Sequence, residues 1–537
     1  MAAFIHDIFA NFLYLAGRYR DLPGLILLPC LALSVPFLAR QIAFSARWLE
    51  PVALVVASAI ILMLAWTSGS YLGNTGYLDH VEASIAAVSW WYHNGHPLYP
   101  GWNDGEGLYG LQYGPLLFQA TAVALSLGPS ILISKLPGFG CFWLACGSVA
   151  WALRPSLPSV RQSLLPIAVV AAMAGGYWRA AYWVRSEPYL LLFAGLALCS
   201  CLRLGPIAAA VAIGLLGGCA VGMKIHGGLY ILPYAVALVA SPGSAGVRVR
   251  IAVIGVVCGI FAAVLPFLDP DVSLVHYAAY LGTALNHGLD RSLLILNVRF
   301  GAVLMMPVLF LAWRHVRGEK QPELLMGLVY CACVAVVCVI GGKRGAGPTH
   351  LLPFLPAFVF FVMRCAQSVR IPGNQDVRRG TLAVCFLVLS IAYLPSFVSN
   401  LIKLQAWDRA VDDPAFRREA TQLYAEYPTA IMGAGGDQSY PLTEYKVIGV
   451  FAGGPLVFDT TTWMDLQKGG VADALTQRLL IGCRSPFWII PNGGEPFTQV
   501  AAYDPDPLFS DRFRQLFHEG YKPIRKGEFY SVWSCRS

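Results

Sequence analysis

The sequence predicts an α-helical polytopic membrane protein of about twelve transmembrane helices, with a small C-terminal α/β domain on the extracytoplasmic side. Two observations predict this class. Of 537 residues, 57% are hydrophobic and 13% are charged, whereas soluble domains carry about 25% charged residues. The long apolar runs stop near Asn400, and the remaining residues have the composition of a soluble domain.

Apolar runs mark the individual helices, because a helix needs about 20 apolar residues to cross the hydrocarbon. We predict spans over Pro23–Ala39, Pro51–Thr67, Ile131–Leu153, Ser163–Tyr182, Pro188–Leu204, Ile207–Met223, Gly228–Ala240, Ile251–Leu268, Leu293–Trp313, Glu323–Ile340, His350–Met363 and Thr381–Ser399.

Positive charge predicts the orientation, because Lys and Arg concentrate in cytoplasmic loops. They cluster in alternate connections, at Arg40, Arg47, Arg154, Arg161, Arg203, Arg248, Arg250, Arg314, Arg317, Lys320, Arg364, Arg370, Arg378 and Arg379. The loop 68–112 contains neither residue type, so we place it outside. This alternation requires Tyr113–Gly128 to be a re-entrant or interfacial helix, and the tail then lies outside as well.

Three parts follow along the chain. Residues 1–50 hold an N-terminal interfacial helix and the first span, 51–400 the transmembrane bundle with outer loop 68–112, and 401–537 the soluble domain. In the last part we predict helices over Asp412–Tyr427, Ala472–Leu480 and Leu508–Gly520, and strands in TAIMGAG, KVIGVF, PLVFDT, PFWIIPN and FYSVWSC.

The net charge bears on the binding partners of the protein, and the cysteines bear on disulfide formation. The net charge of +8 arises from short loops between apolar runs, which excludes a nucleic-acid partner in favour of membrane lipids. Cys483 and Cys535 belong to the tail. An oxidising compartment would allow a disulfide between them, and the sequence leaves open whether they are joined.

The long outer loop carries an acidic helix start. Asp79 and Glu82 are spaced so that both carboxylates share one face, near the positive end of the helix dipole. Two interpretations stay open for Asp79, a catalytic carboxylate and a simple N-cap. The aromatic run Trp90, Trp91 and Tyr92 is typical of anchoring at the membrane interface.

Three shorter outer loops carry charge where orientation rules disfavour it, and ionisable groups near the membrane core are usually functional or mutually paired. These residues are Arg185 and Glu187, Lys224 and His226, and Lys343, Arg344 and His350. Arg185 and Glu187 fit a structural ion pair. The cations Lys224, Lys343 and Arg344 have no surplus carboxylate nearby in sequence and suit a phosphate, or alternatively anionic lipid headgroups.

Together these motifs resemble the GT-C glycosyltransferase superfamily. They are the acidic helix of the first outer loop, the YGPL of Tyr113–Leu116, Glu187 before a proline, and a basic loop running into HLLPFLP. The resemblance is closest to the bacterial branch with the lipid A aminoarabinose transferases and the protein O-mannosyltransferases. It covers Pro51 to about Ser399 and implies a GT-C-like bundle.

The resemblance implies inverting transfer of a sugar from a polyprenyl phosphate donor to a hydroxyl of an envelope glycan, lipid or protein, at the outer face of the inner membrane. Asp79 matches the family's loop-one aspartate and would be the general base. Lys224, Lys343 and Arg344 would hold the donor phosphate, with Tyr113, Arg185, Glu187, His226 and His350 in the same substrate site.

The chain departs from the family pattern at two places. The frequent Asp-Glu or Asp-Asp tandem is Asp79-His80, with the next acid at Glu82, and the usual proline-proline-leucine is Gly114-Pro115-Leu116 preceded by Tyr113. Asp79, His80 and Glu82 are candidate ligands for a divalent metal ion, and metal dependence stays open.

Two other classes of protein stay open as interpretations of the sequence. A secondary transporter would show repeated hydropathy halves and charges at mid-membrane, and neither pattern is evident. A lipid-linked polysaccharide ligase or flippase would share the basic outer loops without needing the acidic helix of loop 68–112.

Overall fold

The computed structural model describes residues 22–536, except 103–104, 106, 177–180, 316–320, 369–374, 412–413 and 501–505. The predicted interfacial helix at the N-terminus lies outside the described residues. Contacts between Cα atoms divide the chain into two compact units, which we describe separately. Unit 1 comprises Met1–Tyr71, Gly138–Val264 and Leu289–Gln405, and unit 2 comprises Leu72–Pro137, Leu265–Gly288 and Ala406–Ser537.

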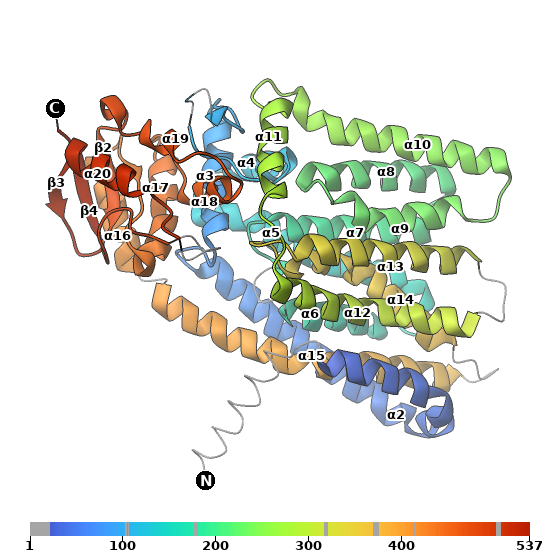
Figure 1. Ribbon diagram of the computed structural model, residues 1–537. Helices are drawn as coiled ribbons and strands as arrows, with labels where there is room; N and C mark the ends of the chain where they lie inside the picture. The colour runs from blue at the N-terminus through green and yellow to red at the C-terminus, as the bar shows by residue number, and fades with distance from the viewer. Residues whose placement is uncertain are drawn as a thin grey trace, which may run out of the picture. The chain divides into compact units, whose positions relative to one another are not determined.

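Unit 1 is helical (Figure 1). Its elements are α2 (Leu22–Gly73, which ends in unit 2), α5 (Ile131–Leu153, which begins in unit 2), η2 (Arg154–Ser156), η3 (Arg161–Ser163), α6 (Leu164–Gly176), α7 (Ser186–Arg203), α8 (Pro206–Met223), α9 (Gly228–Val239), α10 (Ala245–Val264), α12 (Arg291–His315), α13 (Gln321–Gly341), η6 (Pro348–Phe354), α14 (Leu355–Ser368) and α15 (Gln375–Val411, which ends in unit 2).

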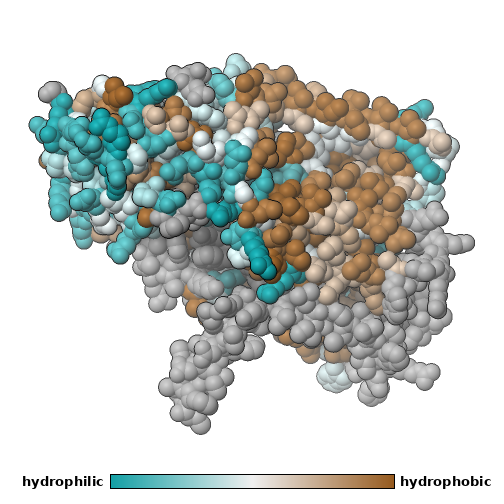
Figure 2. All heavy atoms as spheres, viewed as in Figure 1, coloured by the Kyte–Doolittle hydropathy of each residue, from teal (hydrophilic) through white to brown (hydrophobic). Residues whose placement is uncertain are grey.

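Eight helices of the described residues are long and apolar enough to cross a membrane, so the polytopic helical class is confirmed and the count of twelve is not. These candidate spans are Trp48–Gly73, Ile131–Ser156, Pro206–Met223, Ala245–Leu268, Arg291–Ala312, Pro322–Gly341, Pro348–Gln367 and Arg379–Ile402. Apolar side chains cover the outer surface of α10 (Figure 2), where Val256, Val257, Ile260 and Phe261 are exposed. Such a surface suits contact with lipid.

Several predicted spans differ from the helices observed. The prediction over Gly228–Ala240 corresponds to α9, which has 12 residues, and that over Ser163–Tyr182 to α6, which has 13. The helix α9 is shorter than the length a crossing needs, whereas α6 ends where residues 177–180 fall outside the described part of the chain. The first predicted span, Pro23–Ala39, lies in the part of α2 whose side chains fall outside the described residues.

Glycines let α8 and α10 approach closely. A Cβ atom at Gly214 would lie 2.3 Å from the Gly255 carbonyl oxygen, and one at Gly218 would lie 2.2 Å from that of Gly259. Small residues allow such backbone contact between membrane helices. The glycine spacing of α8 therefore fixes one helix pair of unit 1.

Unit 2 combines Leu72–Pro137, Leu265–Gly288 and the tail from Ala406. Its elements are α3 (His80–His93), α4 (Pro115–Leu125), η5 (Leu265–Leu268), α11 (Leu274–Leu285), α16 (Pro414–Glu426), β1 (Ile431–Met432), η7 (Asp437–Tyr445), α17 (Lys446–Phe451), α18 (Thr460–Lys468), α19 (Ala474–Gln477), η8 (Ile481–Cys483), β2 (Phe487–Pro491), α20 (Asp511–Gly520), β3 (Tyr521–Lys526) and β4 (Tyr530–Cys535).

The tail contains a four-stranded sheet in the order β1-β2-β4-β3. β1 is parallel to β2, whereas β2 with β4 and β4 with β3 are antiparallel. Helix α16 packs on this sheet through Leu423 and Tyr424, which join Ile489 and Val532 in a buried cluster. The predicted small α/β domain is confirmed as part of the fold class.

Two predicted strands of the tail are wrong. KVIGVF forms helix α17, because its buried positions Lys446, Val447, Gly449 and Val450 follow a helical spacing. PLVFDT provides only an isolated bridge from Phe458 to Leu108 before α18 begins. The strand β3 was not predicted.

The apolar run after Tyr113 forms α4, an 11-residue helix with Pro115 in its first turn. At 1.5 Å per residue it is too short to cross the hydrocarbon alone. The membrane orientation and the boundaries at residues 50 and 400 stay predictions.

Candidate functional site

Asp79 is the N-cap of α3. Its side chain accepts a hydrogen bond from the Val81 amide at 2.9 Å, and its side chain is 12% exposed. Glu82 is fully buried, and its Oε1 accepts from the Leu78 amide at 3.2 Å. Both carboxylates thus satisfy donors at the start of the helix, so the capping interpretation describes the observed contacts. The catalytic role of Asp79 stays a prediction.

His80 begins α3, and Tyr113 lies just before α4. The His80 side chain is 28% exposed, and the centroid of its ring lies 5.2 Å from that of the Tyr440 ring. The Tyr113 carbonyl accepts a hydrogen bond of 2.6 Å from the Tyr99 hydroxyl just before α4 begins. His80 therefore adjoins a side chain of the tail, while Tyr113 shapes the entry to α4.

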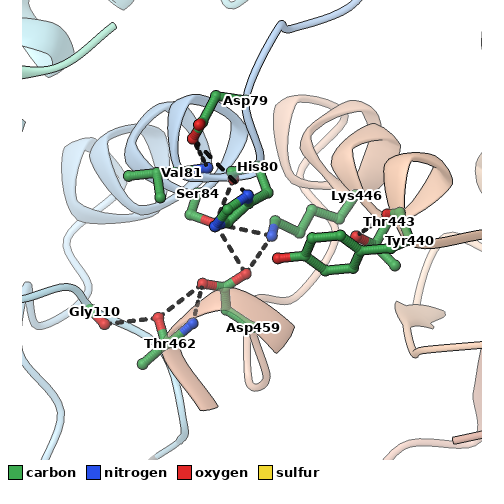
Figure 3. Close-up of polar contacts among 10 residues, drawn as sticks. All are labelled: Asp79, His80, Val81, Ser84, Gly110, Tyr440, Thr443, Lys446, Asp459 and Thr462. Atoms are coloured by element: carbon green, nitrogen blue, oxygen red, sulfur yellow. Dashed lines mark hydrogen bonds and ion pairs between the residues drawn. The ribbon is translucent and has the colours of Figure 1, made fainter. Parts of the chain in front are cut away.

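A buried ion pair that sequence reasoning missed adjoins α3 (Figure 3). The Lys446 ammonium donates to Oδ1 of Asp459, and the two side chains are only 6% and 1% exposed. The same ammonium donates to the Ser84 hydroxyl at 2.9 Å, and Ser84 lies 3.1 Å from Asp459 Oδ1. DTTTW carried an N-cap signal for α18 at Asp459, but nothing in the sequence indicated its partner 13 residues earlier.

Unit 1 contains a second buried pair, between Glu187 and Lys224. The Lys224 ammonium donates to Glu187 Oε1 at 2.9 Å, and the side chains are 11% and 2% exposed. The first turn of α7 presents Glu187, and Lys224 is the C-cap residue of α8. The sequence shows no surplus carboxylate adjacent to Lys224, and it did not indicate this partner, which lies 37 residues away.

Two histidines adjoin this pair. His226 Nε2 lies 3.2 Å from His350 Nδ1, and the His350 carbonyl accepts from the Tyr230 hydroxyl at 2.7 Å. The pKa of His226 is lowered to about 3, mainly because the ring is buried and also because the positive charges of Lys224 and Lys343 disfavour its protonation. His226 is consequently neutral at physiological pH and acts as a hydrogen-bonding group.

The two arginines predicted to bind substrate, Arg185 and Arg344, have different neighbours. The Arg185 guanidinium lies over the Trp183 ring, 4.1 Å from its centroid, and its charge reaches Glu187 and His350. The predicted partnership of Arg185 with Glu187 is thus a longer-range attraction beside the direct Lys224 contact. The positive charge of Arg344 instead interacts with the carboxylate of Asp290, which lies just before α12.

Unit 1 therefore gathers most of its predicted substrate-binding residues into one group, which we call the rim cluster: Arg185, Glu187, Lys224, His226, Lys343 and His350. It combines three cations with one carboxylate and two imidazoles. Such a group can bind an anion while its own carboxylate holds one ammonium in place.

The residues proposed as metal ligands are not arranged for that role. Within the described residues, no three His, Cys, Asp or Glu side chains are grouped to hold a metal ion. Asp79 and Glu82 instead accept backbone amides, as described above.

The long apolar helices define a multi-pass integral membrane protein. Two solved structures with a similar fold are crystal structures of ArnT from Cupriavidus metallidurans, one in the apo state and one bound to undecaprenyl phosphate. Each has a TM-score of 0.53 at 14% identity. The matches cover 89% and 90% of this chain, and 97% of each ArnT chain.

Comparisons of sequence add no further relative, since neither a protein-family model nor a curated protein matches. The likeness to ArnT covers 89–90% of this chain, and because the uncovered share is shorter than the tail, it includes at least part of the tail. At the level of the fold, it confirms the resemblance to GT-C glycosyltransferases predicted from the outer-loop motifs.

Proposed function

We propose that this protein is an inverting glycosyltransferase. It moves a sugar from a polyprenyl phosphate donor to a hydroxyl of an envelope glycan, lipid or protein at the outer face of the inner membrane. The observation that carries the proposal is the shared fold with ArnT, including the structure bound to undecaprenyl phosphate. The rim cluster supports it, because cations at the ends of apolar helices suit a lipid phosphate.

The reaction is a single displacement. The acceptor oxygen attacks the anomeric carbon as the bond from that carbon to the phosphate oxygen breaks, and polyprenyl phosphate leaves. Asp79 takes the acceptor proton, since a carboxylate within reach of the hydroxyl can act as general base. Attack opposite the leaving group inverts the configuration.

The rim cluster acts on the leaving group. Negative charge grows on the phosphate as the sugar departs, and fixed cations stabilise that charge more in the transition state than in the ground state. The cluster's cations Arg185, Lys224 and Lys343 take this role. Arg344, next to Lys343 on the same loop, joins them. Glu187 holds the Lys224 ammonium in one orientation.

The outer face is proposed for two reasons. Lys and Arg are absent from the loop 68–112, which orientation rules place outside. Cys483 and Cys535 are joined by a disulfide in the tail, and disulfides persist in oxidising compartments such as the periplasm.

Purified protein incubated with a panel of polyprenyl phosphate sugars and envelope acceptors tests the proposal. We expect at least one donor to yield a glycosylated acceptor and free polyprenyl phosphate. Lys343→Gln should raise the donor KM by about tenfold or more, as for loss of a charged hydrogen-bond donor. Arg248→Gln, at an exposed site on α10, is the matched control and should leave KM unchanged. Flux across a vesicle membrane without a covalent product would instead identify a transporter.

A further inference from the structure

The buried pair of Lys446 and Asp459 holds α3 through a side chain of that helix. Ser84 accepts from the Lys446 ammonium at 2.9 Å, and its own proton is within reach of Asp459 Oδ1 at 3.1 Å and of the His80 carbonyl at 3.1 Å. Ser84 is fully buried and lies five residues after Asp79. The start of α3 is therefore fixed by a charged contact from the tail.

The second carboxylate oxygen of Asp459 is fixed as well. It accepts from the Thr462 amide at 3.0 Å and from the Thr462 hydroxyl at 2.7 Å. That hydroxyl also lies 2.6 Å from the Gly110 carbonyl, on the same outer loop as α3. Figure 3 shows the Tyr440 hydroxyl pointing toward the pair from the other side. Asp459 thus links α3, the end of the outer loop and α18 at one point.

Simple stabilisation is a poor explanation of this arrangement. Apolar residues of similar volume often serve stability as well as a buried ion pair does, because removing two charges from water is costly. A buried ion pair does, however, fix the orientation of its side chains, since its hydrogen bonds are satisfied in one geometry only. The observed geometry orients the helix whose first residue follows Asp79.

We propose that Lys446 and Asp459 are positioning residues, which act through Ser84 to orient α3 and hold the Asp79 carboxylate where it receives the acceptor proton. The tail is then a functional part of the catalytic machinery. This inference rests on the function proposed above, and it assigns the tail a role in the chemical step and none in donor binding.

Ser84→Ala tests it, with Ser89→Ala as the matched control. Both serines are fully buried on α3, and the Ser89 hydroxyl has no hydrogen-bond partner in the described part of the chain. We expect Ser84→Ala to lower kcat by about ten- to hundredfold with the donor KM unchanged, as for a displaced catalytic group. Ser89→Ala should leave both constants as they are.

Amide exchange over the first turn of α3 provides a readout independent of turnover. It should be about tenfold faster in Ser84→Ala than in the native protein and unchanged in Ser89→Ala, because loss of a local contact favours local opening. The double variant Lys446→Met with Asp459→Leu should fold and repeat the kcat loss.

Native kcat in Ser84→Ala, or equal exchange in the two serine variants, would overturn the inference. Faster exchange with unchanged kcat would also overturn it, since the pair would then be structural only. A native protein that turns over no donor refutes the proposed function itself, which the exchange measurement does not depend on.

Discussion

Lys224 at the end of α8 donates to Glu187 at the start of α7 across 2.9 Å, although 37 residues separate them. Removing one partner of such a buried pair leaves an uncompensated charge. Glu187→Leu should therefore destabilise the protein by about 3 kcal/mol. Thermal unfolding in detergent measures the loss.

Glu187→Leu combined with Lys224→Met is the control, because it removes both charges. It should recover most of the unfolding temperature while lowering donor affinity. An equally unstable double variant would show that packing and not charge pairing accounts for the loss.

The stability should fall as the pH is lowered, because His226 is held neutral in the folded state. Its pKa is lowered from 6.5 to about 3, so its contribution is fully present above pH 6.5 and is lost as the pH falls toward 3. The expected slope is about 1 kcal/mol per pH unit in that window. Unfolding temperatures measured from pH 7 to 4 give the slope, and His226→Gln should flatten it. An unchanged slope in that variant would assign the titration to another group.

Helix packing in unit 1 predicts unequal effects at neighbouring glycines. Gly218→Ala places a Cβ 2.2 Å from the Gly259 carbonyl oxygen, whereas Gly217→Ala meets nothing closer than Ile231 at 3.7 Å. We expect Gly218→Ala to cost about 1–3 kcal/mol through overpacking, and Gly217→Ala to be neutral or stabilising. The same unfolding assay checks both, and equal effects would argue against the close approach of α8 and α10.

The disulfide leads us to expect that the two cysteines of the tail are oxidised in cells. Cys483 and Cys535, with Cα atoms 5.8 Å apart, should resist alkylation until a reductant is added. Replacing both by Ser should lower stability by up to about 4 kcal/mol, since a bridge across 52 residues restricts the unfolded chain. Alkylation of both cysteines in untreated cells would count against an extracytoplasmic tail.

Local patterns allowed much of the fold to be predicted. The apolar runs located most long helices, and short runs rich in aromatic and β-branched residues located β2 and β4. KVIGVF was assigned to a strand because its β-branched residues resemble one, but the burial of Lys446 and the contact of Gly449 with Tyr424 fit a helix. Composition over six residues does not distinguish the two.

The site was predictable in its residue types and less so in its pairings. Asp79 stood out because it begins an acidic helix, and Lys224 and His350 stood out because ionisable groups near the membrane core are unusual. Their partners did not, since Glu187 contacts Lys224 from another helix and Lys446 lies 362 residues from Ser84. Such contacts depend on tertiary packing that no local spacing encodes.

In the proposed reaction, Asp79 is the group that activates the acceptor hydroxyl. Asp79→Asn tests it most directly, because asparagine caps a helix as well as aspartate does and should preserve the contact with Val81, so the fold stays intact. We predict that sugar transfer from the polyprenyl phosphate donor falls by a factor of about 10² to 10⁴, with donor binding retained. Transfer at the native rate by this variant would contradict the account.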